Sequence, residues 1–249
     1  EESMKQKWLI TCGNFFFRYR DTLFPLFILF AVFLLKPTLP MGSAAANNIT
    51  DLIGVVITLT GQFLRIFTIG FKYIKRGGKN KKVYADSLVV DGVFAHCRNP
   101  MYVGNIMIFL EAAVIINSPL LYVIGIPLVG FVYGSIIAAE EKFLHDKFGA
   151  AYDIYRAKVP RLMPNLHGLR ESLSGYTFQW RRVLVKEFVT FSVTLAGLIG
   201  LRIWTLYKIF GADALPEIWA WMWAIPVIAA FFLTIFALKK SHRLTDGSA

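Results

Sequence analysis

Apolar residues along this 249-residue chain are gathered into six long blocks that polar segments separate. An α-helix rises about 1.5 Å per residue, so about 20 apolar residues cross a hydrocarbon core of about 30 Å. Each block has that length or approaches it, and each is predicted to be a membrane-spanning helix. The blocks are 22–39, 52–73, 101–116, 120–139, 188–210 and 218–238.

The pattern predicts an all-α, polytopic integral membrane protein with about six transmembrane helices. Asn117, Ser118 and Pro119 form a turn signal, so the third and fourth blocks should make a helical hairpin. We divide the chain into an N-terminal segment with the first helix (1–51), a core (52–165), and an amphipathic connector with two C-terminal helices (166–249).

Composition agrees with a membrane protein, because 56% of the residues are hydrophobic and only 17% are charged. Soluble domains are nearer 45–50% apolar and about 25% charged. A disordered chain is excluded. The two cysteines, Cys12 and Cys97, have no CxxC spacing, so neither a metal site nor a disulfide framework is expected.

The net charge of +11 follows the predicted topology. Of the 27 Lys and Arg residues, 23 lie in the N-terminal segment, in the connections after the second and fourth blocks, and in the C-terminal tail. Only Lys36 and Lys208 lie on the other side, near the outer ends of the first and fifth blocks. The positive-inside rule then places both termini in the cytoplasm, of either a bacterial inner membrane or an ER-type membrane. The basic charge therefore needs no nucleic-acid partner.

Charged residues inside the blocks are candidate functional residues, because a charge at mid-membrane depth is costly. Arg65 lies about nine residues from the cytoplasmic end of its block, or roughly 13 Å deep. Glu111 has a similar depth and would pair with Arg65 if the second and third helices are neighbours. The alternative for Arg65 is a structural ion pair or snorkelling. Arg202, near the outer end of the fifth block, is interpreted as structural.

The cytoplasmic segments 74–100 and 140–186 are too long to be simple connections, so we expect function there. In the first, Gly92 and Gly104 permit close backbone approach, Pro100 suits a first helical turn, and Asn99 is a candidate cap. Free N–H groups at that helix start could hold a carboxylate or phosphate.

In the second segment, Glu140 and Glu141 are predicted to end the fourth helix, where two acids oppose the helix dipole and favour a cationic ligand. The aromatic and aliphatic residues that follow give an amphipathic face. That face would lie on the bilayer or cover a pocket. A solvated juxtamembrane helix is the alternative. The residues of this face are Phe143, Leu144, Phe148, Tyr152 and Tyr155.

Together these segments resemble the integral-membrane methyltransferase superfamily, which includes isoprenylcysteine carboxyl methyltransferases and phospholipid methyltransferases. The family pattern has G-x-x-L-R in a membrane helix, then a loop ending R-H-P-x-Y-x-G, then E-E followed by F-G-x-x-Y-x-x-Y and V-P-x-x-[LM]-P. Here these motifs are Gly61 to Arg65, Leu88 to Gly104, and Glu140 to Pro164. The family histidine is Asn99 in this chain, which leaves that contact in doubt.

The resemblance implies S-adenosylmethionine-dependent methyl transfer to a lipophilic acceptor in the membrane, either an isoprenylcysteine-like carboxylate or a lipid amine. It implies Arg65 and Glu141 as catalytic residues, with Arg65 orienting the acceptor. It also implies a cofactor site with no metal, which is made of Gly92, Val93, Arg98, Asn99, Pro100, Tyr102, Gly104, Glu140, Glu141, Tyr152 and Tyr155.

Two alternatives remain. An NADPH-dependent sterol or isoprenoid reductase would look similar around the Arg-x-Pro-x-Tyr-x-Gly helix start, but such enzymes tend to lack the tandem glutamates. A non-enzymatic membrane protein is the other.

The expected partners are a lipophilic or lipidated substrate and membrane lipids. The role of the last two helices stays open: they could form a homo-oligomer surface or a lid.

Overall fold

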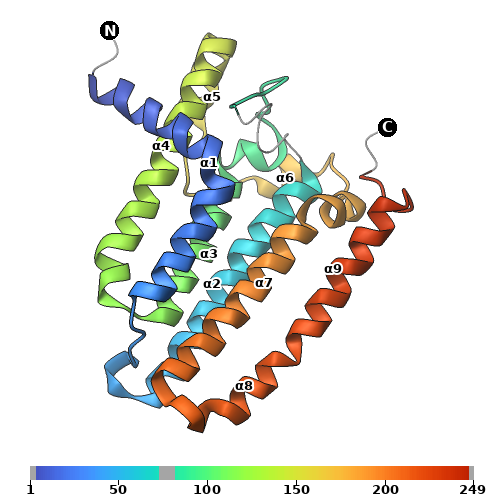
Figure 1. Cartoon of the computed structure of the whole chain (residues 1–249). Coiled ribbons are helices and arrows are strands. Elements are labelled where there is room, and N and C mark those ends of the chain that lie inside the picture. Colours follow the sequence, from blue (N-terminus) through green and yellow to red (C-terminus); the bar gives the residue numbers. More distant parts are fainter. Residues whose placement is uncertain (1–3, 73–81, 247–249) are drawn as a thin grey trace.

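The computed structural model describes residues 4–72 and 82–246, and this part of the chain is helical with no strand. Long helices run side by side in one bundle, and the two short helices α5 (Ala150–Lys158) and α6 (Leu169–Leu173) lie at one end of it (Figure 1). We call this end the polar end. The bundle consists of α1 (Met4–Leu34), α2 (Ala44–Phe71), α3 (Pro100–Ile116), α4 (Ile126–Phe148), α7 (Trp180–Phe210), α8 (Leu215–Met222) and α9 (Ala224–Lys240). The all-α prediction is confirmed.

Glycines let two pairs of helices approach at backbone distance. A Cβ atom on Gly104 of α3 would lie 2.7 Å from the carbonyl oxygen of Gly61 in α2, so α2 and α3 touch where neither has a side chain. A Cβ atom on Gly13 of α1 would lie 2.0 Å from the carbonyl oxygen of Ser135 in α4. Helix α7 packs against α2, α3 and α9. The second, third and fifth predicted blocks therefore share one interior.

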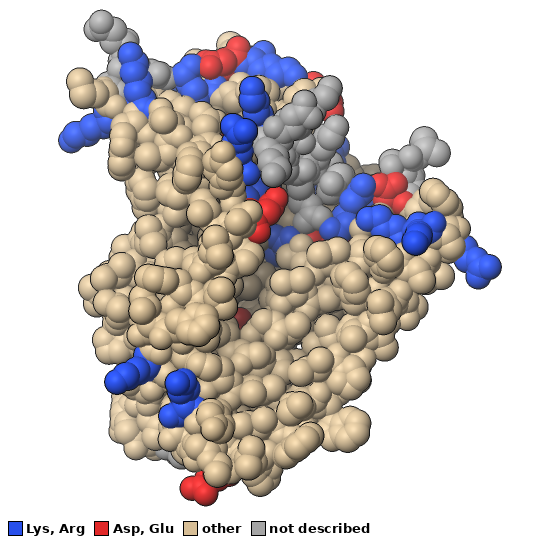
Figure 2. Space-filling model, viewed as in Figure 1, with Lys and Arg blue, Asp and Glu red and all other residues tan. Residues whose placement is uncertain are grey.

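Three helical segments are long and apolar enough to cross a membrane, namely 46–71, 121–148 and 180–240, and α3 is a shorter apolar helix. The last segment is folded back by the short helix Gly211–Ala214, so that α9 runs antiparallel beside α7 (Figure 1). These helices bear out a polytopic membrane protein, while the count of six spans stays a prediction. Lys and Arg gather at the polar end, and the face below them is almost entirely uncharged (Figure 2).

Several helix boundaries differ from the sequence-based ones. Helix α1 begins at Met4, well before the apolar block at residue 22, and α4 continues to Phe148. The prediction that Glu140 and Glu141 end a helix is therefore wrong. The last turn of α4 instead carries His145 and Lys147, which suit the negative end of the dipole. Polar residues can extend a helix beyond its apolar block when they meet partners at the polar end.

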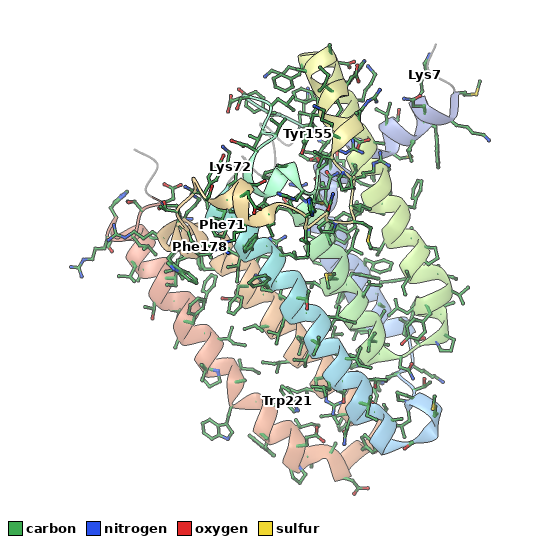
Figure 3. All side chains as sticks on the ribbon, turned by 180° about the vertical axis from the view of Figure 1, so that it is seen from behind. Lys7, Phe71, Lys72, Tyr155, Phe178 and Trp221 are labelled. Atoms are coloured by element: carbon green, nitrogen blue, oxygen red, sulfur yellow. The ribbon has the colours of Figure 1, made fainter. Side chains whose placement is uncertain are left out.

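Specific residues fix the turn between α3 and α4 and the approach of α7 to α2. The predicted turn between α3 and α4 is present, with Asn117 in the left-handed region at φ 47°. At the other end of the molecule, Phe178 packs on Gly70 and stands beside Phe71, with ring centroids 5.2 Å apart (Figure 3). This contact brings the start of α7 to the end of α2.

Part of the basic segment 74–100, including Lys75, Arg76, Lys79 and Lys81, lies outside the described residues.

Candidate functional site

The two segments that the sequence singled out lie against each other at the polar end. The backbone N–H of Arg98 donates to the carbonyl of Pro160 at 2.9 Å, and that of Asn165 donates to the carbonyl of His96, also at 2.9 Å. Residues 96–98 and 160–165 therefore form one paired strip of backbone. This strip joins the start of α3 to the end of α5, which places the two motifs in one site.

Glu141 is the charged centre of this site. Its carboxylate lies 2.9 Å from Arg98 NH1 and accepts two hydrogen bonds from Arg161, at 3.0 and 2.5 Å. The same nitrogen, Arg98 NH1, also donates to the Tyr152 hydroxyl at 3.4 Å. The structure thus brings together three of the predicted residues and adds Arg161, which the sequence analysis did not select.

Glu140 belongs to a second set of contacts one step around α4. Tyr102 of α3 donates its hydroxyl proton to Glu140 at 2.7 Å, and Arg20 of α1 donates to the Tyr102 oxygen at 3.3 Å. The adjacent glutamates therefore face different neighbours: Glu141 faces the strip, and Glu140 faces α1 and α3. Arg20 was not a predicted site residue.

The loop before α3 holds the remaining predicted residues in fixed positions. Gly92 has a positive φ of 58° and begins a short 3₁₀ helix with Val93 buried beneath it. Pro100 occupies the first turn of α3, as predicted. Asn99 occupies the cap position, but its side chain makes no cap hydrogen bond and donates instead to the carbonyl of Arg161 at 3.0 Å.

The predicted amphipathic face covers this loop rather than the bilayer. Tyr152 and Tyr155 are buried and pack with Val159, Leu144 and Phe148 into a small apolar cluster. The Tyr155 hydroxyl donates to the carbonyl of Phe94 at 2.8 Å, and burial raises the pKa of this phenol above its usual range. Helix α5 therefore fixes the loop that leads into α3.

Arg65 is buried between α2, α3 and α7, away from the strip. Its Nε and NH2 donate to the two carboxylate oxygens of Glu187 at 2.6 and 3.0 Å, and its NH1 donates to Asn105. Gln62 donates to the same carboxylate at 3.2 Å. The predicted pairing of Arg65 with Glu111 is wrong, although α2 and α3 are neighbours, because Glu187 of α7 faces Arg65 more directly.

The middle part of the chain is similar to known proteins. Residues 49–151 match the family model described as phospholipid methyltransferase. The chain is 32% identical over 126 residues to the protein-S-isoprenylcysteine O-methyltransferase of Xenopus laevis, covering 48% of this chain and 42% of that protein. It is 29% identical over 119 residues to the Saccharomyces cerevisiae enzyme of the same name, covering 46% and 48%.

The matched part of the chain is thus similar to isoprenylcysteine and phospholipid methyltransferases. The chain spans under half the length of these curated relatives. No solved structure matches. The matches give no support to the reductase alternative.

The methyltransferase-like segment does not contain every residue of the polar clusters. It includes Arg65, Arg98, Glu140 and Glu141, whereas Glu187 lies beyond it. Arg20, Tyr152 and Arg161 also lie outside residues 49–151. The sequence analysis missed Glu187 because the residue precedes the fifth apolar block. The sequence did contain a signal for Glu187. A buried Arg65 needs an acidic partner at the same depth, and Glu187 is the one acidic residue in α7.

Two buried nitrogens near the family motif have no partner within residues 4–72 and 82–246. They are Arg98 Nε and His96 Nε2, both in the loop that leads into α3. Buried polar atoms normally find partners in proteins, and unpartnered ones call for an explanation. Here they leave hydrogen-bonding capacity for a polar ligand beside Glu141.

Proposed function

We propose that this protein transfers a methyl group from S-adenosylmethionine to a lipophilic acceptor in the membrane. The observation that carries the proposal is the meeting of two of the three family motifs at the polar end, where Arg98 contacts Glu141 at 2.9 Å and Tyr102 contacts Glu140 at 2.7 Å. The similarity of residues 49–151 to phospholipid methyltransferases agrees with it. On this proposal the polar end faces the cytoplasm, as its Lys and Arg residues favour.

The residues at the polar end fit the charges of S-adenosylmethionine. The cofactor carries a sulfonium and an ammonium, and Glu140 and Glu141 supply two carboxylates within one turn of α4. Its own carboxylate needs donors, and the Arg98 Nε–H is buried without a partner in the described chain. Hydrogen bonds in which one partner is ionised are the stronger ones, so this set could hold the cofactor firmly.

When bound, S-adenosylmethionine supplies an electrophilic methyl carbon, to which an acceptor lone pair bonds while the carbon–sulfur bond breaks and its electron pair stays on sulfur. The protein's part in such a displacement is positioning and charge complementarity. Glu141 binds charge on the cofactor side, and Arg98 and Arg161 hold Glu141 in place. A carboxylate acceptor requires no proton transfer, whereas an amine acceptor must lose a proton.

Arg65 receives a revised role in this proposal. Three of its nitrogens already donate to Glu187 and Asn105, and its side chain is almost fully buried. We therefore assign Arg65 a positioning role: it keeps α2, α3 and α7 together beneath the site. Its Cγ lies 2.6 Å from the position that a Cβ atom on Gly104 would take, so the side chain also supports the first turns of α3.

Calorimetric titration of the detergent-purified protein with S-adenosylhomocysteine tests the proposal, and NADPH serves as the parallel ligand. Saturable binding of S-adenosylhomocysteine alone is expected, followed by transfer of labelled methyl groups to lipid-soluble acceptors. Binding of NADPH alone would favour a reductase. A folded sample that binds neither ligand would contradict both enzyme hypotheses.

A further inference from the structure

Basic residues gather where the end of α9 meets the start of α7. Segments 178–186 and 236–245 together contain six Lys and Arg residues and no Asp or Glu. We call these six residues the basic cluster: Arg181, Arg182, Lys186, Lys239, Lys240 and Arg243. Figure 2 shows positive side chains where α9 ends, directly above an uncharged face. Like charges repel one another, so such a cluster favours an anionic partner.

The packing of α9 on α7 places charges from both helices at one level. The ring centroids of Phe188 and Phe232 lie 5.3 Å apart, which fixes the register of the two antiparallel helices. Arg181 lies seven residues before Phe188, and Lys239 lies seven residues after Phe232. Since the helices run in opposite directions, these two side chains stand side by side at the polar end.

The tail beyond α9 turns back and keeps Arg243 in the basic cluster. The backbone N–H of Leu244 donates to the carbonyl of Leu238 at 3.1 Å, and Asp246 contacts Lys186 at 2.5 Å. The negative charge of Asp246 is thus placed against Lys186 and not against the outer members of the cluster. The exposed members are Arg181, Lys239, Lys240 and Arg243.

The surface around the basic cluster suits a lipid better than a soluble anion. Trp180, next to Arg181, is 66% exposed, and tryptophan is enriched at membrane–water interfaces. Farther along the same helices, Val193 and Leu233 are 64% and 61% exposed and face outward. A headgroup at the level of the cluster would therefore have its acyl chains against an apolar face of α7 and α9.

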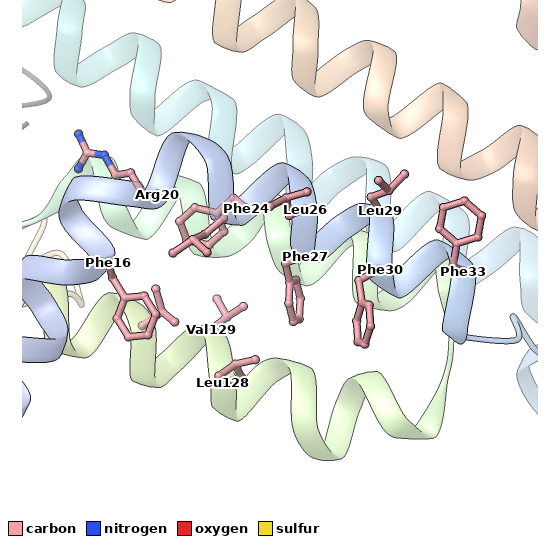
Figure 4. A pocket seen from close by; sticks show the side chains of 12 residues that line it. Phe16, Arg20, Phe24, Leu26, Phe27, Leu29, Phe30, Phe33, Leu128 and Val129 are labelled. Carbon is pink, nitrogen blue, oxygen red and sulfur yellow. The ribbon is translucent and has the colours of Figure 1, made fainter.

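Arg20 is a contrasting basic residue beside an apolar surface. It stands at one end of a groove of about 530 Å³ between α1 and α4, whose other lining residues are apolar (Figure 4). Arg20 donates to the Tyr102 hydroxyl at 3.3 Å, and its guanidinium carbon lies 4.4 Å from the centroid of the Phe17 ring. The charge of Arg20 is thus engaged within the bundle, whereas the basic cluster presents several charges outward.

We propose that the basic cluster binds the headgroup of an anionic phospholipid, whose acyl chains lie along α7 and α9. Arginine matches the geometry of a phosphate group, and each Lys or Arg near an anionic lipid surface contributes about fivefold in affinity, or ~1 kcal/mol. One headgroup that contacts both helices holds α9 against α7. The site lies outside residues 49–151, so it gives the C-terminal helices a role that does not rest on the proposed methyl transfer.

Native mass spectrometry of the detergent-purified protein tests this site. The probes are phosphatidylglycerol and phosphatidylcholine with identical acyl chains, which differ only in their headgroups. The wild type should bind its first phosphatidylglycerol at least about tenfold more tightly than phosphatidylcholine. A variant that combines Arg181→Gln, Lys239→Gln, Lys240→Gln and Arg243→Gln should bind the two lipids about equally. A wild type without any preference would overturn the proposal.

A matched control removes four exposed positive charges from α1 and α5. It combines Lys5→Gln, Lys7→Gln, Arg18→Gln and Lys158→Gln, and Lys7 lies across the polar end from α9 (Figure 3). The control should keep the preference for phosphatidylglycerol. An equal loss in both variants would mean that net charge alone attracts the lipid, and the site would be refuted.

Two further measurements keep the test independent of folding defects. The charge-preserving variant Arg181→Lys with Arg243→Lys should retain most of the preference, and thermal unfolding shows whether each variant is folded. In the wild type, a higher salt concentration should lower the preference, because ions screen exposed charges. A preference that salt leaves unchanged would contradict a charged headgroup site.

Discussion

Glu141 and Gly104 are the single residues on which the proposed site depends most directly. Glu141 holds two arginines, Arg98 and Arg161, on one carboxylate. Gly104 has no side chain at the point where α3 presses on Arg65 and on the backbone of α2. Glu141 supplies a charge, and Gly104 leaves room for close helix packing. Substitution of Glu141 should therefore change ligand affinity, whereas substitution of Gly104 should change the free energy of unfolding.

Glu141→Gln should weaken S-adenosylhomocysteine binding by about 10- to 150-fold, because a charge-assisted contact contributes about 1.5–3 kcal/mol. Asp146→Asn is the matched control, since it makes the same change on α4 at an exposed carboxylate that pairs with Lys142 across one turn. Calorimetry on both variants measures the difference. Equal affinities for the two variants would move the cofactor site away from Glu141.

Gly104→Ala should lower the free energy of unfolding by about 1–3 kcal/mol, because the added Cβ would lie 2.6 Å from Arg65 Cγ and 2.7 Å from the Gly61 carbonyl. Gly134→Ala on α4 is the control, since nothing lies within 4 Å of its Cβ position. Thermal unfolding in detergent compares the two. If Gly104→Ala is as stable as Gly134→Ala, the contact between α2 and α3 has room for a methyl group, and the close approach of their backbones is contradicted.

Among the helices, α7 joins the C-terminal part of the chain to the methyltransferase-like core. Glu187 reaches Arg65 near the polar end, and Arg202 reaches Asp51 of α2 at 2.6 Å and Glu217 of α8 at 3.0 Å near the other end. Helix α7 is thus fixed to α2 by two ion pairs that are 15 residues apart on α7. The segment 166–249 shares its interior with the core.

Glu187→Ala should cost about 3–5 kcal/mol of stability, because it leaves the buried Arg65 charge without its partner. The double variant Arg65→Leu with Glu187→Leu should recover most of that loss. Two apolar side chains bury no charge, so no desolvation penalty has to be offset by an ion pair. Thermal unfolding of the double variant and of the single variants Arg65→Leu and Glu187→Leu completes a double-mutant cycle. A double variant as unstable as the sum of its single variants would contradict a direct pair.

Over the whole molecule, charge is divided between the two ends of the bundle. The polar end carries most Lys and Arg residues (Figure 2), and the tail is tied there by a 2.5 Å contact between Lys186 and Asp246. The opposite end carries the turn at Met41, which is 99% exposed. A membrane would therefore divide the molecule between these ends.

Site-directed labelling tests that division. In a background with Cys12→Ser and Cys97→Ser, a membrane-impermeant thiol reagent added to intact cells should label Met41→Cys but not Ser174→Cys, which lies beside α6 at the polar end. Inverted vesicles should give the opposite result. Labelling of both positions from one side would contradict the predicted orientation.

Much of the fold was predictable because its signals are local. The apolar blocks gave α3 almost to the residue, and the Asn-Ser-Pro turn was correct. Boundaries failed where polar residues continue a helix, as in α4 from Glu140 to Phe148. The motif residues Arg98, Glu141 and Tyr152 do meet in space, but Arg161 and Arg20 could not be selected, because nothing near them in the sequence distinguishes them from other surface arginines.

The sequence alone determined that this is a helical membrane protein with a methyltransferase-like core, because hydrophobic length, charge asymmetry and motif spacing are properties of the chain. Only the tertiary structure decided that Arg65 pairs with Glu187 instead of Glu111 and that α1 and α4 enclose a groove ending at Arg20. Those outcomes depend on how the helices are rotated and how closely they approach. Side chains far apart along the chain set both quantities together.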